Sequence, residues 1–579
     1  MSTELMGVVA MFALTVLLAL PLGKFIAKVF RGEPNALDFL APLERLLFRL
    51  GGIDPTRPMT WKQHLLALLT LNLVWFVYAF FMLLFQGSLP LNPDGNLSQT
   101  PDLAFNTAIS FLVNCNLQHY SGESGLTYLT QTAVILFLQF TTAATGIAAL
   151  AVVFNALQTR VSTELGNFYD YFVKSITRLL LPLSLVVAVI IAFNGTPTSY
   201  DGKASVVTLQ GDSVQVARGP AAGMIAIKQL GTNGGGWFGV NSAHPLENPT
   251  YLSNMVEDVS ILLIPITLVF ALGFYLNRRR LGYMVFGVMT AGFLGLFLPS
   301  LVAELNGNPA IDEMGIDQRL GSLEGKEMRL GAAASAYWGI TTTATSNGSV
   351  NAMHDSMTPL SGAMQLLDMM INALYGGVGV GFLNFFVFLI IAVFISGLMV
   401  GRTPEFLGRK VEAREMKIAS LLAILHPLLI LAGTAIASYL ASIDANMGVW
   451  FANAEGAGQV ATAWLNNPGF HGFSEMLYEY TSASANNGSG FEGLGDNNLF
   501  WNFTTGLVLM LSRYLPIVGP VAIAGLLAQK KYVPESAGTL RTDTATFGVV
   551  TFAVIFIIAA LAFFPALALG PLAEYFSLK

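Results

Sequence analysis

The chain has 579 residues, of which 54% are hydrophobic and 11% are charged. Soluble domains carry about 25% charged residues, so this composition excludes an ordinary soluble protein and predicts that most of the chain lies in a membrane. The single cysteine, Cys115, excludes an internal disulfide framework and a cysteine-based metal cluster. The net charge of −6 is informative only through its distribution along the chain.

The first apolar run extends from Leu5 to Leu22. A signal peptide carries its positive charge before the apolar run, whereas Lys24, Lys28 and Arg31 follow this one. This order predicts a retained first helix that begins outside the cell and ends in the cytoplasm.

About 20 apolar residues span the hydrocarbon core of a bilayer. By this measure the sequence predicts an all-α membrane protein with ten transmembrane helices and both termini outside the cytoplasm. The crossings are expected near 5–28, 63–86, 126–157, 175–194, 256–277, 281–303, 365–400, 418–440, 499–528 and 545–569.

The basic residues support this topology. The segments assigned to the cytoplasm hold 21 of the 29 Lys and Arg residues, which is the bias expected of cytoplasmic loops. These residues lie in 24–62, from Arg160 to Arg178, from Arg278 to Arg280, from Arg402 to Lys417 and from Lys530 to Arg541.

Four short polar stretches interrupt the apolar chain, each after a short helix-like run, and the topology places all four on the outer side. They are residues 114–118, 232–236, 345–349 and 484–488. Irregular backbone at membrane depth survives only where protein buries it or where it lines a water-filled path. Four copies predict four walls around one axis, where carbonyl oxygens replace the water shell of a cation.

The repeating unit is a long helix, a loop, a short half-helix, the polar stretch and a second long helix. The chain therefore predicts four pseudo-fourfold repeats around a central pore, with one flanking helix at each end. The predicted repeats are 63–158, 175–278, 281–400 and 418–528, preceded by a flanking helix and cytoplasmic loop at 1–62 and followed by a flanking helix at 545–579.

Glycine in the polar stretches allows the dihedral angles that turn successive carbonyls inward, and the partly negative C-terminus of each half-helix should favour a cation. Aligned on the last residue of their shared core, the reference positions are Gln118, Gly234, Gly348 and Gly488. The Gln118 amide either contributes to ion discrimination or packs behind the loop, and Cys115 is interpreted as a small structural residue. The predicted filter residues are Asn114, Cys115, Asn116, Gln118, Thr232, Asn233, Gly234, Thr345, Ser346, Asn347, Gly348, Ala485, Asn486, Asn487 and Gly488.

Glycines at 376, 377, 379 and 381 should weaken or break the seventh helix. Gly376, Gly377, Gly379 and Gly381 then form either a hinge or gate below the filter or a close helix contact.

Arg513 lies inside an apolar run, and an ionisable residue there is a functional hypothesis. It either faces the pore and repels a passing ion or forms a structural ion pair, for example with Asp368.

Three histidines lie near the polar stretches. His244 and His354 follow the second and third stretches and are expected to act as hydrogen-bonding braces, because a zinc site needs more ligands at suitable spacing. His471 precedes the fourth half-helix and is interpreted as a cap. The sequence has no Gly-x-x-x-x-Gly-Lys-Ser/Thr loop, so energy must come from an ion gradient, the membrane potential or a partner chain.

Several long motifs carry a family resemblance. They are Gly231-Thr-Asn-Gly-Gly-Gly236 running into Asn241-Ser-Ala-His-Pro-Leu-Glu-Asn-Pro249, Asn351-Ala-Met-His-Asp-Ser356, Gly401-Arg-Thr-Pro-Glu-Phe-Leu-Gly408 and Ser484-Ala-Asn-Asn-Gly-Ser489. Over essentially its whole length, the chain resembles the KdpA family, the potassium-translocating subunits of bacterial Kdp potassium-transporting ATPases.

The resemblance implies the fold of the potassium transporter superfamily, K⁺ as the ion held in the filter, no organic cofactor, and a location in the bacterial inner (plasma) membrane. It implies that this chain does not hydrolyse ATP. The implied partners are the lipid bilayer, the P-type ATPase chain KdpB, the single-span subunit KdpC and the small peptide KdpF, with no nucleic acid. In family members K⁺ passes from the filter through a lateral tunnel to KdpB, and the broken seventh helix and Arg513 match the elements thought to block direct passage.

Two other functions were weighed. The first is a stand-alone potassium channel or symporter of the Trk or Ktr type, regulated by a cytoplasmic nucleotide-binding ring. The second is an enzyme working within the membrane, for which the sequence offers no convincing nucleophile–base pair or metal cluster. The two flanking helices and the family motifs favour the pump subunit.

Overall fold

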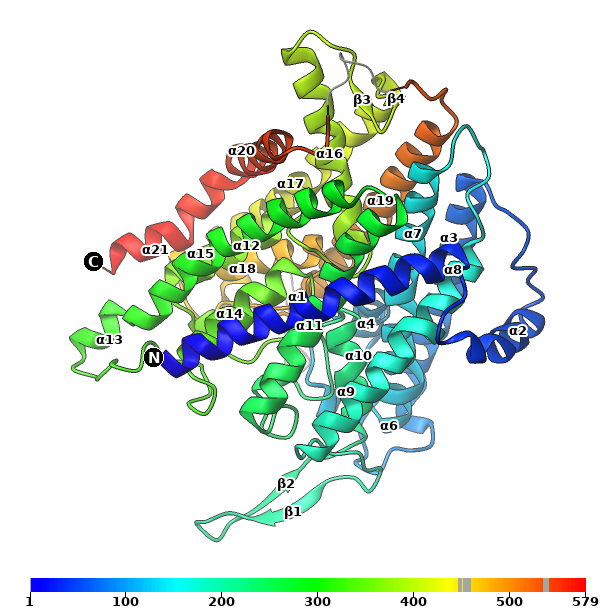
Figure 1. Ribbon diagram of the computed structural model, residues 1–579. Helices are drawn as coiled ribbons and strands as arrows, with labels where there is room; N and C mark the ends of the chain where they lie inside the picture. Colours follow the sequence, from blue (N-terminus) through cyan, green and yellow to red (C-terminus); the bar gives the residue numbers. More distant parts are fainter. Residues whose placement is uncertain (1, 446–449, 451–459, 535–540, 579) are drawn as a thin grey trace.

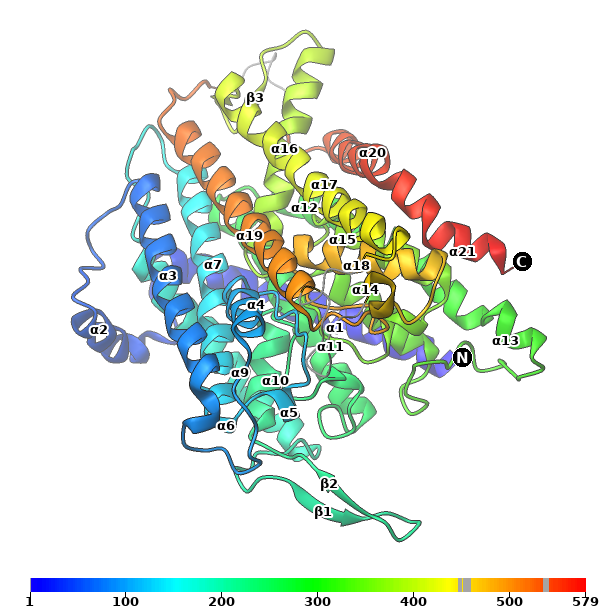
Figure 2. The same ribbon diagram turned by 180° about the vertical axis from the view of Figure 1, so that it is seen from behind.

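The computed structural model describes residues 2–445, 450, 460–534 and 541–578. The described residues form ten apolar spans that are long enough to cross a membrane. The predicted all-α class and the number of crossings are therefore confirmed. Both termini lie near α13 at one end of the bundle, while α2 and the β3–β4 hairpin lie at the other (Figures 1 and 2).

Eight spans contain one continuous long helix. These are α1 (Ser2–Arg31), α3 (Trp61–Phe85), α11 (Tyr251–Tyr275), α12 (Arg279–Asn306), α16 (Val380–Met399), α17 (Ala413–Ser442), α19 (Leu499–Ala528) and α20 (Ala545–Leu569).

The other two spans each contain a π-helical turn. One turn, Gln131–Leu136, joins α6 (Tyr128–Thr130) to α7 (Phe137–Gln158), and the other, Ile176–Leu180, joins α8 (Phe168–Ser175) to α9 (Leu181–Phe193).

Local sequence sets several helix starts. Thr60 and Thr250 cap α3 and α11, and each accepts a hydrogen bond from the backbone N–H three residues later, at Gln63 and Ser253. The side chains of Gln63 and Ser253 bond back to the N–H of the cap. These reciprocal pairs satisfy two N–H groups that a helix start would leave without partners.

Four short helices lie inside the bundle and correspond to the predicted half-helices: α4 (Pro101–Leu112), α10 (Ala221–Leu230), α14 (Ala332–Ala344) and α18 (Phe470–Ala485). Each packs against the helix that precedes it and the helix that follows it in its own repeat. The partners are α3 and α7 for α4, α9 and α11 for α10, α12 and α15 for α14, and α17 and α19 for α18.

The short helices also link neighbouring repeats in a closed order. α10 contacts α7 of the first repeat, α14 contacts α11 of the second, α18 contacts α15 of the third, and α4 contacts α19 of the fourth. The last contact joins segments about 400 residues apart and closes the ring. The four repeats are therefore arranged around one axis, as predicted; their residue boundaries stay predictions.

The seventh crossing differs from the prediction of one helix over 365–400. Instead α15 (Pro359–Ile371) ends at Asn372, an irregular segment follows, and α16 begins at Val380. Asn372, Tyr375, Gly376 and Gly379 have φ between 46° and 82°, which an α-helix cannot contain. The glycine run therefore breaks the helix, as its composition predicts.

Helix α1 packs along α11, and α20 packs against α12, α15 and α16, so both flanking helices lie outside the ring. Apart from short 3-10 turns, the remaining described elements are α2 (Ala41–Leu50), α5 (Gly122–Gly125), α13 (Pro309–Glu313), α21 (Pro571–Ser577) and two hairpins that the sequence did not predict. Those hairpins pair β1 (Ala204–Val207) with β2 (Ser213–Val216) and β3 (Glu405–Phe406) with β4 (Arg409–Lys410).

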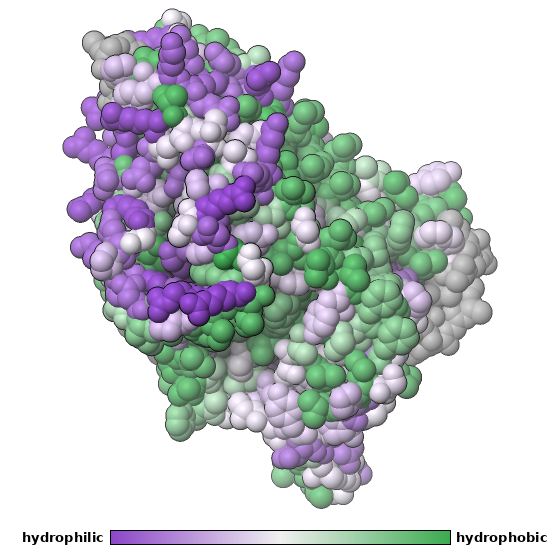
Figure 3. All heavy atoms as spheres, turned by 90° about the vertical axis from the view of Figure 1, so that its right-hand side faces the viewer, coloured by the Kyte–Doolittle hydropathy of each residue, from purple (hydrophilic) through white to green (hydrophobic). Residues whose placement is uncertain are grey.

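The surface separates into polar ends and an apolar middle. Hydrophilic residues gather at the upper end of the face in Figure 3 and again at its lower tip, and apolar side chains cover much of the area between them. Apolar side chains on the membrane spans are exposed: Leu185 and Phe193 on α9 and Leu561 on α20 are 59%, 90% and 79% exposed. Lipid chains would cover such side chains.

His471 anchors the end of the chain rather than capping α18, so the cap interpretation is wrong. It lies in the first turn of α18, and its Nδ1 and Nε2 are each 2.9 Å from a carboxylate oxygen, of Glu574 on α21 and of Asp355 respectively. Burial opposes its positive charge, but these two carboxylates outweigh burial and raise the pKa of His471 to about 10.

The charged form of His471 should therefore stabilise the fold in a pH-dependent way. Because its pKa is raised, this stability is fully present below the unfolded pKa of about 6.5 and declines as the pH rises toward about 10. In detergent, His471→Gln should lower the Tm at pH 6–7 and remove part of the fall in Tm between pH 7 and pH 10. His244→Gln is the control and should leave that fall unchanged; equal slopes for His471→Gln and the native chain would contradict the assignment.

Candidate ion-binding site

The four polar loops share one backbone pattern. In each loop, two residues that are separated by one position have positive φ. The pairs are Asn114 and Asn116 (60° and 59°), Thr232 and Gly234 (47° and 89°), Ser346 and Gly348 (53° and 85°), and Asn486 and Gly488 (51° and 101°). The repeated pattern gives the four loops the same turn at the C-terminal end of their short helices.

Three glycines of this pattern touch the next loop. A Cβ on Gly234 would overlap the carbonyl oxygen of Asn347, a Cβ on Gly348 would overlap that of Asn487, and a Cβ on Gly488 would overlap that of Cys115. The second loop thus contacts the third, the third contacts the fourth, and the fourth contacts the first. Only glycine allows both the positive φ and this approach between backbones.

The seam between the first and second loops is different. The backbone pattern makes Asn116, not Gln118, the equivalent of the three glycines, so the predicted alignment on Gln118 is wrong by two residues. The Oε1 of Gln118 instead accepts a hydrogen bond of 2.9 Å from the N–H of Gly236. A Cβ on Gly235 would lie 2.5 Å from the carbonyl oxygen of Asn116. This seam therefore combines a side-chain amide with a close backbone contact.

Buried asparagine amides fasten the first and fourth loops to a neighbouring repeat. Asn114 Nδ2 donates to the carbonyl of Thr232 at 2.8 Å, and Asn487 Nδ2 donates to that of Thr342 at 2.7 Å. The Oδ1 of Asn487 accepts from the N–H of Ser489 at 3.0 Å. Each amide thus uses both of its ends and fixes the orientation of its loop.

A cavity of about 630 Å³ lies over one face of the ring, and we call it the vestibule. Residues that come after each of the four loops line it, including His119, Asn241, Val350 and Gly490. The vestibule therefore opens onto the ends of the loops that lie farthest from the short helices.

The broken segment 372–379 lies against the opposite face of the ring. The N–H of Val378 donates to Thr232 Oγ1 at 2.9 Å, and the N–H of Gly376 donates to the carbonyl of Ala344 at 2.8 Å. On its far side, a Cβ on Gly379 would overlap the carbonyl oxygen of Gly146 in α7. The segment is thus held between the second and third loops and the middle of α7.

Arg513 lies beside this segment. A Cβ placed on Gly146 would be 3.5 Å from Arg513 Nη2 and would also overlap the carbonyl oxygen of Val378. The arginine is buried, and its Nη2 makes no hydrogen bond within the described part of the chain. The alternative of an ion pair with Asp368 is wrong, because Asp368 Oδ2 instead accepts from Thr343 Oγ1 at 2.9 Å and no ion pair joins the two described side chains.

The structure gathers all the predicted filter residues around this ring. They are buried except for Gln118 and Gly488, which are partly buried, and Thr345 and Ala485 stand at the ends of α14 and α18. Their role in holding an ion stays a prediction.

His244 and His354 are braces, as predicted. The His244 ring stacks on Phe238 with centroids 3.9 Å apart, and its Nδ1 accepts from the N–H of Leu246. His354 Nδ1 lies 2.9 Å from the hydroxyl of Tyr478, and burial lowers the pKa of His354 to about 3, so the ring is neutral.

A buried polar network behind the second loop was missed by the sequence analysis. Lys228 on α10 forms an ion pair with Glu247, and both side chains are fully buried. Ser242 Oγ lies 2.9 Å from Glu247 Oε1 and 2.8 Å from Oε2 of Glu257 on α11, so its one proton can be donated to either carboxylate. Glu247 lies in a sequence motif with two asparagines, where it looks like an ordinary loop residue. Only its burial in the structure shows that it belongs to this network.

Removing one charge of this pair should destabilise the chain strongly. Lys228→Met leaves the Glu247 carboxylate buried without its counter-charge, which should lower the free energy of unfolding by about 3–5 kcal/mol. The double variant with Glu247→Gln should recover most of this loss. Arg319→Met, which breaks an exposed pair with Asp317, is the control and should leave unfolding unchanged. Denaturant unfolding in detergent measures the free energy of unfolding of all three variants. A Lys228→Met chain as stable as the native chain would contradict the buried ion pair.

Comparison with known proteins identifies the family. The KdpA family, described as the potassium-transporting ATPase A subunit, matches residues 9–576. The chain is 66% identical over 580 residues to the "Potassium-transporting ATPase potassium-binding subunit" of Flavobacterium johnsoniae, and 61% identical over 578 residues to that of Phocaeicola vulgatus, with all of each chain covered. It is 45% identical to that of Geobacillus kaustophilus, over 98% of each chain.

Among solved structures, the potassium transporter TrkH of Vibrio parahaemolyticus has a similar fold, with a TM-score of 0.50 and 13% identity over 90% of this chain and 98% of that one. This likeness concerns the fold alone. Together with the ring of four loops, the match of the family along almost the whole sequence leads to one conclusion: the chain belongs to the KdpA family.

Proposed function

We propose that this chain is the potassium-binding and translocating subunit of an ATP-driven potassium uptake pump, and that the ring of four loops is its selectivity filter. The closed series of contacts among these loops carries the proposal, because it brings backbone carbonyls of four repeats to one axis. The curated relatives bear the name of potassium-binding subunits of such an ATPase.

The ring suits a dehydrated monovalent cation. Backbone carbonyls replace the hydration shell of K⁺ in potassium-selective filters. The four short helices end at the ring, so their partly negative C-termini add to the attraction for a cation. The asparagine amides hold the loops from behind, which keeps the carbonyls in place when the ion enters.

The vestibule is proposed to face the outside of the bacterial inner membrane. Its lining includes Gly325 and Glu327, in the loop that follows α13, near the end of the bundle where both termini lie. The basic loops of α2 and β3–β4 lie at the opposite end, where cytoplasmic loops carry an excess of Lys and Arg. Both termini are then extracytoplasmic.

The exit from the filter is proposed to be lateral. The segment 372–379 and Arg513 occupy the face opposite the vestibule, so an ion passing straight through meets both a folded backbone and a positive charge. A second cavity, lined by Asn372, His426 and Ser484, begins beside this face and leads between α15, α17 and α20.

A pump needs a source of energy, and we propose that a partner chain, not this one, supplies it by hydrolysing ATP. The proposed partners are the P-type ATPase chain KdpB, which would hydrolyse ATP, together with KdpC and KdpF. The alternative of a stand-alone Trk- or Ktr-type channel rests on a likeness of fold at 13% identity, whereas the pump subunit rests on relatives identical at up to 66% of positions along the chain.

The glycine contacts in the ring make the test of function specific. Gly234→Ala introduces a Cβ that overlaps the carbonyl oxygen of Asn347 at φ 89°, so the ring must widen or shift. The concentration of K⁺ that half-saturates ATP hydrolysis by the co-expressed assembly should rise by about tenfold or more, the effect of about 1.4 kcal/mol.

Gly223→Ala is the matched control, because Gly223 lies on α10, the short helix that precedes the second loop, with nothing within 4 Å of its Cβ position. It should leave the response to K⁺ unchanged. Equal K⁺ responses of Gly234→Ala and the native assembly would refute the filter, and ATP hydrolysis that does not respond to K⁺ in the native assembly would refute the pump subunit.

Arg513 should act through its charge. In liposomes that contain the chain alone, Arg513→Met should raise the passive flux of K⁺ by about tenfold, because it removes a positive charge from the face of the ring opposite the vestibule. Arg513→Lys keeps the charge and should keep the flux low. If both variants leak equally, the arginine acts by packing and not by repulsion.

A further inference from the structure

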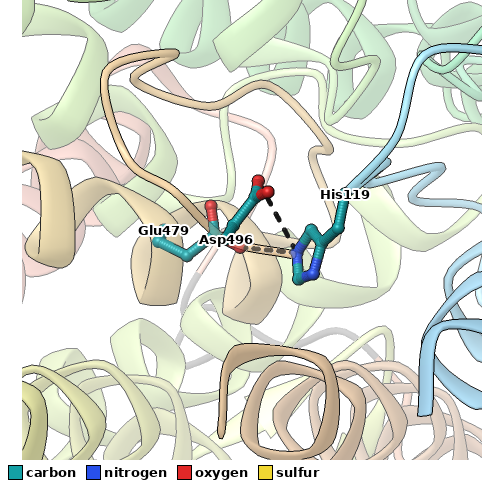
Figure 4. Close-up of side chains that lie close together, drawn as sticks. All are labelled: His119, Glu479 and Asp496. Carbon is teal, nitrogen blue, oxygen red and sulfur yellow. Dashed lines mark hydrogen bonds and ion pairs between the residues drawn. The ribbon is translucent and has the colours of Figure 1, made fainter. Parts of the chain in front are cut away.

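Beside the vestibule, three side chains from distant parts of the chain face one another. They are His119, which directly follows the first loop (114–118), Glu479 on α18 and Asp496 before α19 (Figure 4). The Nε2 of His119 is 3.1 Å from Glu479 Oε1 and 3.9 Å from Asp496 Oδ2, and the three ligand atoms all lie within 4.8 Å of one another. We call these residues the vestibule triad.

The imidazole of His119 is held in the orientation that suits a metal ligand. Its Nδ1 lies 2.7 Å from Asn502 Oδ1, and Asn502 Nδ2 donates to Asp102 Oδ2 at 2.8 Å. The bond to Asp102 sets which end of the Asn502 amide is oxygen, so His119 Nδ1 carries a proton and donates it. Nε2 therefore faces the two carboxylates, as in metal sites whose histidine donates its other N–H to a neighbouring oxygen.

The charges of the triad leave room for a cation. His119 is fully buried and Glu479 is 2% exposed. One imidazole faces two carboxylates, so the negative charges outnumber the positive charge that the imidazole can carry. Among the described residues, no Lys or Arg forms an ion pair with Glu479 or Asp496. Buried carboxylates are stable when a counter-charge or a metal ion pairs with them.

The triad is also open to solvent on one side. His119 and Asp496 line the vestibule, and the Asp496 side chain is 28% exposed. A tetrahedral zinc ion with bonds of about 2.0–2.2 Å keeps its ligand atoms about 3.3–3.5 Å apart, close to the separations of His119 Nε2 from the two carboxylates. Three protein ligands and one water from the vestibule would complete four-coordination.

We propose that the vestibule triad is a binding site for a divalent transition-metal ion of the zinc class. Imidazole with carboxylates suits such ions better than it suits K⁺, Mg²⁺ or Ca²⁺, which prefer oxygen ligands alone. The bound ion joins the end of the first loop to α18 and to the segment before α19. The site is separate from the ring of carbonyls and does not depend on the pump function.

The metal must compete with a proton. Burial opposes the charge on His119, but Asp496, Glu479 and Asn502 outweigh burial and raise the pKa of His119 to about 9. Zinc binds the deprotonated imidazole, so binding releases this proton and the apparent affinity should be higher at pH 8.5 than at pH 7.0.

The test uses the full chain in detergent, stripped with EDTA and titrated with ZnCl₂ by calorimetry at pH 7.0 and 8.5. One Zn²⁺ per chain is expected, with affinity at least about tenfold weaker in His119→Gln and in Asp496→Asn, since each removes one ligand. His244→Gln is the matched control and should bind as the native chain does, because His244 lines the same vestibule but stacks on Phe238.

A measurement on the native chain avoids variants that fail to fold. An anomalous difference map at the zinc edge should place one peak within bonding distance of His119 Nε2 and both carboxylates. A peak instead at the group Asp355, His471 and Glu475 would overturn the proposal. So would the absence of stoichiometric zinc, which would leave the triad as an ion pair only, or undiminished binding in His119→Gln.

Discussion

The ring of loops depends on one kind of contact, a glycine without Cβ lying against a carbonyl oxygen of the neighbouring loop. Gly234, Gly348 and Gly488 make this contact in turn, and each has a φ near 90°. A side chain at any of these positions would push two backbones apart and strain the turn at the same time. The rest of the molecule, from the short helices to the asparagine amides, orients these loops so that the contact can form.

The surrounding bundle positions the loops for this contact because the same helix arrangement is repeated four times. Each short helix lies between two helices of its own repeat and touches one helix of the preceding repeat, and α4 closes the circle against α19. Four similar units in one chain produce a ring without any symmetry of subunits. The break at 372–379 shows that the repeats are free to diverge below the ring while the loops themselves keep their common backbone pattern.

Hydropathy and glycine content predicted the large features because these follow from local composition. A helix that crosses lipid must be apolar along its own length, and the close succession of glycines at 376, 377, 379 and 381 weakens a helix locally. Pairings between distant residues are different. Asp368 bonds to Thr343 rather than Arg513, and Lys228 meets Glu247, because of how helices pack after folding. The equivalence of Asn116 to the glycines is visible only in φ, which the residue type does not specify for asparagine.

The seam between the first and second loops makes the four walls unequal, since the side chain of Gln118 bonds to Gly236 there, while each of the other seams has a glycine against a carbonyl oxygen. In a tetramer of identical chains, every substitution appears four times around the axis. In this chain, a single substitution changes one of the four loops and leaves the other three unchanged. Natural selection can thus adjust the width of the opening in small steps, at a wall where the rotamer of a glutamine side chain adds to the close contact between main chains.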